Sequence, residues 1–145
     1  MAGSRGDGRT AMATVVVGFV PKPEGEAALA AAIAEVRLRG GRLVVVSAQR
    51  GGESDPEWMA KTEAELAAAR ERLDAAGVEY VIHQSVIDID VDAADDLVQV
   101  AREQGSDLVV IGIRRRTPTG KLILGSQAQR ILLDAPCPVL AVKPE

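Results

Sequence analysis

Short apolar runs rich in β-branched residues alternate with helical segments along most of this chain of 145 residues. Runs that are apolar almost throughout are typical of strands covered on both faces, as in a parallel sheet. The expected strands are 14–19, 43–47, 80–85, 108–111 and 139–142, and the expected helices are 24–39, 56–76, 92–104 and 126–133. The alternation predicts a doubly wound α/β domain, an open five-stranded parallel sheet with helices on both faces.

Glycines and buried stripes support the helix assignments. Gly40, Gly77 and Gly105 directly follow the last expected residues of three helices, where a left-handed backbone commonly ends a helix. Residues at helical spacing predict the inward faces, which are Leu29, Ile33 and Val36 in the first helix, Trp58, Thr62, Leu66, Ala69 and Leu73 in the second, and Leu97, Val100 and Ala101 in the third.

The composition argues against several classes of protein. The net charge is −4 and aromatic residues make up only 2%, so neither a polyanion-binding surface nor a base-stacking platform is expected, and nucleic acid is not an expected partner. One cysteine, Cys137, and one histidine, His83, rule out a disulfide within the chain and argue against a zinc site, so no metal ligands are predicted. No apolar run approaches the ~18 residues of a membrane span, and we expect a cytoplasmic protein with no membrane contact.

The first residues differ in character from the rest of the chain. They are small, polar and rich in glycine, which predicts a disordered N-terminal tail over 1–12. The remainder, 13–145, has the length of one ordinary domain with its own core.

The segment 107–143 has the layout of an anion site. A strand that ends near Gly112 is followed by a basic loop and then by Gly125 and Ser126 at the start of a helix. Free amides and the dipole at a helix N-terminus favour phosphate. Ser126 with Gln129 three residues later also has the spacing of a capping box with Ser126 as the N-cap, so an anion site and a plain cap are both open.

The basic loop allows two interpretations as well. Arg114, Arg115 and Arg116, with Lys121, have the chemistry to clamp a di- or triphosphate through bidentate contacts. A run of charges is also what an ordinary solvated surface loop contains.

These motifs resemble the universal stress protein family. Nucleotide-binding members carry a Gly-2x-Gly-9x-Gly-[Ser/Thr] signature after the fourth strand, and Gly112, Gly125 and Ser126 fall in its register. The run 137–143, CPVLAVK, is similar to the family's closing strand, and the likeness covers 13–145. The resemblance implies the strand order 3-2-1-4-5, a possible ATP or AMP ligand with Mg²⁺, and a homodimer.

Two residues depart from the family's nucleotide-binding pattern. The second signature glycine falls at Arg115, whose bulk and Cβ lie where the backbone of that glycine would approach phosphate. The aspartate that holds the adenine end in nucleotide-binding members is Val20 here, which offers no acceptor. The candidate nucleotide or anion site consists of Gly112, Arg115, Gly125, Ser126, Gln127, Val20 and Ser47.

Three functions fit this sequence. The departures favour a regulatory or interaction module in stress response, with impaired nucleotide binding and an unidentified protein partner. The second is an ATP or AMP sensor that uses the loop between Gly112 and Ser126, and the third is a weak ATPase, for which no catalytic residue is visible. We expect a homodimer through the fifth strand, since a short apolar edge strand must be covered or paired; its residues are Val139, Leu140, Ala141 and Val142.

Overall fold

A computed structural model describes residues 12–50, 56–87, 92–114 and 124–144, except for the side chains of 48–50, 58 and 85–87. The expected N-terminal tail, apart from Met12, and the expected inward position of Trp58 lie outside the described residues. All statements about the fold refer to the described part of the chain.

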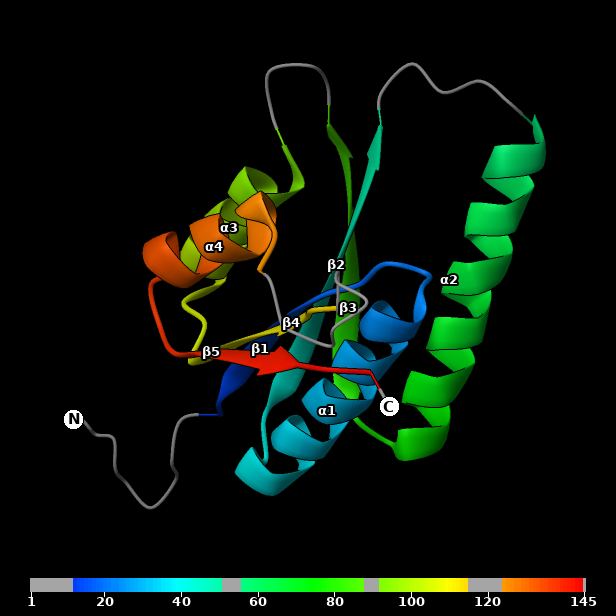
Figure 1. Ribbon diagram of the computed structural model, residues 1–145. Coiled ribbons are helices and arrows are strands. Elements are labelled where there is room, and N and C mark those ends of the chain that lie inside the picture. The colour runs from blue at the N-terminus through cyan, green and yellow to red at the C-terminus, as the bar shows by residue number, and fades with distance from the viewer. Residues whose placement is uncertain (1–11, 51–55, 88–91, 115–123, 145) are drawn as a thin grey trace.

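Five parallel strands form one sheet in the order β3-β2-β1-β4-β5, as expected from the resemblance (Figure 1). The strands are β1 (Thr14–Gly18), β2 (Arg42–Arg50), β3 (Glu79–Ile87), β4 (Leu108–Gly112) and β5 (Val139–Val142). β1 lies at the centre and pairs with β2 on one side and β4 on the other. The predicted fold class is therefore confirmed.

Helices cover both faces of the sheet, and two cores result. The helices are α1 (Pro23–Arg39), α2 (Pro56–Ala76), α3 (Ala93–Gln104) and α4 (Ser126–Asp134). Figure 1 shows α1 and α2 on one face and α3 and α4 on the other. Successive side chains of a strand point to opposite faces, so Val15 and Val17 pack in the α1–α2 core while Val16 packs in the α3–α4 core.

The predicted stripes face these cores. Leu66, Ala69 and Leu73 of α2 are buried, as are the inward residues predicted for α3. Gly40, Gly77 and Gly105 all have positive φ, which confirms the three expected helix ends. β5 is less buried than its apolar sequence suggested, because it is an edge strand whose outer side has no neighbour among the described strands.

Two glycines let the first turn of α1 lie against the backbone at the carboxyl end of the sheet. A Cβ on Gly25 would lie 1.8 Å from the carbonyl oxygen of Val20, and a Cβ on Gly112 would lie 2.0 Å from that of Glu24. Real Cβ atoms do not come this close, so both positions exclude any side chain. These contacts fix where α1 begins relative to β1 and β4.

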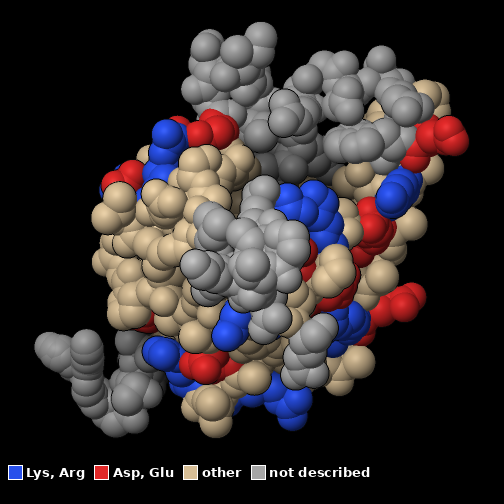
Figure 2. Space-filling model, in the orientation of Figure 1, with Lys and Arg blue, Asp and Glu red and all other residues tan. Residues whose placement is uncertain are grey.

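The surface is charged but mixed. On the face shown in Figure 2, basic and acidic side chains are interspersed rather than gathered by sign. None of the described helices is both long and apolar enough to cross a membrane.

Replacing Gly25 with alanine tests the backbone contact. Alanine normally stabilises a helix by about 1 kcal/mol relative to glycine, but here its Cβ would collide with the Val20 carbonyl. We expect Gly25→Ala to lower the free energy of unfolding in urea by about 1–3 kcal/mol, the usual cost of overpacking. Ala30→Gly, at an exposed position of the same helix, is the control, because it measures the effect of helix propensity alone on the free energy of unfolding. A Gly25→Ala protein more stable than the original would contradict the contact.

Candidate functional site

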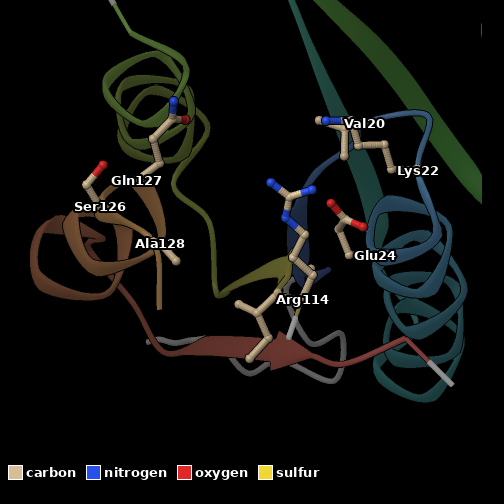
Figure 3. A pocket seen from close by; sticks show the side chains of 10 residues that line it. Val20, Lys22, Glu24, Arg114, Ser126, Gln127 and Ala128 are labelled. Atoms are coloured by element: carbon tan, nitrogen blue, oxygen red, sulfur yellow. The ribbon is translucent and has the colours of Figure 1, made fainter. Parts of the chain in front are cut away.

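A pocket of about 300 Å³ lies at the carboxyl ends of β1 and β4, between the N-termini of α1 and α4 (Figure 3). This is where a doubly wound sheet binds its ligands, because the helices on its two faces diverge there. The residues that line it are Val20, Lys22, Glu24, Gly112, Ile113, Arg114, Gly125, Ser126, Gln127 and Ala128.

Two helix N-termini meet at this pocket. Ser126, Gln127 and Ala128 form the first turn of α4, where backbone N–H groups have no partner within the helix. Across the pocket, Lys22 is the N-cap of α1, and Glu24 stands in its first turn. The positive ends of two helix dipoles therefore face the same space, which favours an anion.

Three charged side chains add to this field. Figure 3 shows the side chains of Arg114 and Glu24 pointing toward one another in the middle of the pocket, with Lys22 beside them. Among the described residues, none of the three forms an ion pair. Two cations and one carboxylate leave a single net positive charge from the described side chains that line the pocket.

A second, more apolar pocket of about 190 Å³ adjoins the first. The two share Val20, Gly112, Gln127 and Ala128, so they lie side by side. The second pocket reaches toward the α3–α4 core, where Leu97, Val46 and Ile111 form part of its wall. We call it the apolar slot.

The structure brings most of the predicted site residues together. Gly112, Gly125, Ser126, Gln127 and Val20 all line the charged pocket. Val20 is 44% exposed and lies at the junction of the two pockets.

Two predicted site residues are not among the residues found lining the pockets. Ser47 is buried near the carboxyl end of β2, and it lines neither pocket. Arg115 lies outside the described residues, so the proposed effect of this arginine on the pocket is still a hypothesis.

The predicted capping box is wrong. Gly125 is the N-cap of α4 and Ser126 is the first helical residue, and no side chain in the described part of the chain caps the helix. Gln129 does not reach back to the N-cap amide as a capping box requires; its side-chain amide donates to the Leu124 carbonyl at 3.0 Å. The absence of a side-chain cap leaves the first amides of α4 available to a ligand.

Gly112 has a different role from the one that its place in the signature suggests. Its missing Cβ makes room for the Glu24 carbonyl of α1 rather than for a ligand. The glycine therefore brings α1, and with it Lys22 and Glu24, to the pocket.

No sequence pattern pointed directly to Glu24 or Ala128 as pocket residues. Glu24 is an ordinary acidic residue for the first turn of a helix, and Ala128 has no functional group. Their proximity depends on how closely α1 and α4 approach the sheet. The one available signal was that the helix after β1 starts at the edge of the sheet where ligands bind.

Ion pairs hold α4 against α3. The guanidinium of Arg130 donates to Asp92 at 2.5 Å and to Asp95 at 3.2 Å, and these carboxylates, Asp92 foremost, raise the pKa of Arg130. At the other end, Arg102 of α3 donates to the carbonyl of Asp134 at 3.0 Å. These exposed contacts add to the burial of Ile131 in the core between α3 and α4.

The residues outside the pocket offer little chemistry. His83 is exposed on the edge strand β3, and Cys137 is partly buried with its sulfur 3.2 Å from the Ser106 hydroxyl. Within the described ranges, no three His, Cys, Asp or Glu side chains are grouped so that they could hold a metal ion.

The fold and the site together define an α/β protein with a pocket between two helix N-termini at the carboxyl edge of its sheet. Comparison with known proteins gives the family: the model of the universal stress protein family matches residues 12–143. A universal stress protein of Mycolicibacterium smegmatis is 41% identical over 130 residues, which cover 90% of this chain and 97% of that protein. The chain therefore belongs to the universal stress protein family.

Solved structures agree with this assignment. A universal stress protein from Archaeoglobus fulgidus has a TM-score of 0.75 and 35% identity, covering 92% of this chain and 99% of that one. A structure of the universal stress protein from Archaeoglobus fulgidus in complex with dAMP has a TM-score of 0.68 and 28% identity, covering 92% and 98% of the two chains.

Proposed function

We propose that this chain is a stress-response regulatory protein whose pocket binds a nucleoside monophosphate. The observation that supports this most directly is the meeting of two helix N-termini and two cations around a pocket that adjoins an apolar slot. A phosphate fits the first part and a nucleoside fits the second. The Archaeoglobus fulgidus protein that binds dAMP has the same fold.

Among the described residues, the charge balance of the pocket favours a monophosphate over a triphosphate. Lys22 and Arg114 contribute two positive charges, and Glu24 offsets one of them. A monophosphate ester carries close to two negative charges at neutral pH, whereas ATP carries about four and would place more of them near the Glu24 carboxylate. A ligand with fewer charges needs less compensation from the pocket.

We also propose that nucleotide binding is impaired, in the sense that affinity is reduced rather than abolished. Val20 lines the pocket where nucleotide-binding relatives carry a carboxylate, so one polar contact is missing and binding is weaker than in a protein that has it. If Arg115 filled the phosphate space as well, no nucleotide would bind, and Arg115→Gly would restore binding.

Calorimetric titration with AMP tests the proposed function. We expect the wild type to bind AMP, and Lys22→Ala to weaken binding about three- to tenfold, because a charge-assisted hydrogen bond to phosphate is lost. Arg37→Ala is the matched control, since Arg37 is an exposed cation in the last turn of α1, at the opposite end from the pocket.

Two results would contradict the proposal. One is the absence of AMP binding by the wild type at millimolar concentration. The other is an equal loss of affinity in Lys22→Ala and Arg37→Ala, which would show that only the overall charge matters.

We also propose that two copies of the chain pair through β5. The amides of Val109 and Ile113 donate to the carbonyls of Pro138 and Val142 at 3.0 and 2.9 Å. Backbone groups of successive residues in a strand point to opposite sides, so those of Val139 and Ala141 point away from β4. An apolar edge strand with outward-facing amides is a template for a second strand. The resemblance to a family of dimers supports this pairing.

Sedimentation velocity with Ala141→Pro tests the dimer. Proline removes the outward amide of Ala141 and leaves the hydrogen bonds to β4 in place, and edge strands tolerate proline. We expect the wild type to sediment as a dimer and Ala141→Pro as a folded monomer. Ala141→Asp, which adds a charge to the same edge, is expected to do the same, while Ala34→Asp on α1 stays dimeric. A monomeric wild type, or a dimer that survives both edge substitutions, would contradict this pairing.

A further inference from the structure

The apolar slot contains few side chains that can form hydrogen bonds with a ligand. Of the 12 described residues that line it, Gln127 alone has a polar side chain, and that residue is exposed. The remaining side chains that line it are aliphatic or aromatic, or belong to glycine.

Two backbone carbonyls beside the slot are engaged as well. The carbonyl of Val46 accepts a hydrogen bond from the Phe19 amide at 3.0 Å, and the carbonyl of Val20 accepts one from the Lys22 amide at 2.8 Å. The Val20 carbonyl is further enclosed by the close approach of Gly25. Acceptors that could distinguish one base edge from another are therefore scarce on the described walls.

We infer that the slot holds the planar face of a base and does not read its edge. The ligand class is then a nucleoside monophosphate with a flat, weakly polar base. When the ligand is AMP, the 6-amino group of adenine contributes nothing to affinity. This inference rests on the proposed function, because it assumes that the phosphate occupies the adjoining charged pocket.

The physical reason is the difference between apolar and polar recognition. A site built to hydrogen-bond a substituent rejects an analogue without it by several orders of magnitude, because its own polar groups are left unpaired. An apolar wall loses nothing when the substituent is removed. It also favours the less polar analogue, since a buried amino group without a partner has lost its water.

Titration of the full chain with two nucleotides tests the inference. The ligands are AMP and purine riboside 5′-monophosphate, which lacks the 6-amino group. We expect the dissociation constants to agree within about threefold, or the analogue to bind more tightly. AMP binding at least about tenfold tighter than the analogue would overturn the inference and leave the proposed function standing. Binding of neither ligand would overturn both.

A substitution in the slot sharpens the test. Ala93 lines the apolar slot but not the charged pocket. It is the first residue of α3, where an aspartate stabilises the helix. Ala93→Asp supplies an acceptor, and we expect it to shift the ratio of the two affinities about tenfold in favour of AMP. Ala27→Asp, at a partly buried position of α1 that lines neither pocket, is expected to leave the ratio unchanged.

The ratio also tests where the base lies. An unchanged ratio in Ala93→Asp would overturn the placement of the base in the slot. A shift of the same size in both variants would do so too, because the effect could then not come from a contact in the slot.

Discussion

The site depends on a backbone contact between the first turn of α1 and the carboxyl end of the sheet. Gly25 lies against the Val20 carbonyl, and Gly112 lies against the Glu24 carbonyl, with no room for a Cβ at either position. This contact places the N-terminus of α1 directly opposite that of α4. Without it the dipole of α1, the ammonium group of Lys22 and the carboxylate of Glu24 would lie further from the pocket.

The second determinant of the site is the electrostatic balance that this geometry creates. Two helix N-termini and two cationic side chains attract an anion, while Glu24 limits how much negative charge the pocket can hold. The start of α4, which has no side-chain cap among the described residues, contributes free amides. Ion pairs from Arg130 connect α4 to α3. The apolar slot beside them has almost no polar side chains on its described walls, so in the proposed complex charge acts on the phosphate and shape acts on the base.

Much of this fold follows from local patterns in the sequence. Glycines with positive φ end three helices, and continuous apolar runs mark the strands of the sheet. The strand order came from the resemblance to a family rather than from local patterns. The capping role of Ser126 was predicted wrongly, because capping-box spacing does not determine where a helix begins. Glu24 and the apolar slot could not be predicted, since they depend on how closely segments distant in the sequence approach one another.

The central claim is that a phosphate lies on the first turn of α4 while a base lies in the apolar slot. Amide and methyl chemical shifts of isotope-labelled protein, followed by NMR during addition of AMP, test this claim most directly. The account predicts the largest shifts at the amides of Ser126, Gln127 and Ala128, together with shifts at the methyl groups of Leu97 and Ile111. Saturating shifts confined to other surfaces, or no shifts at millimolar AMP, would contradict it.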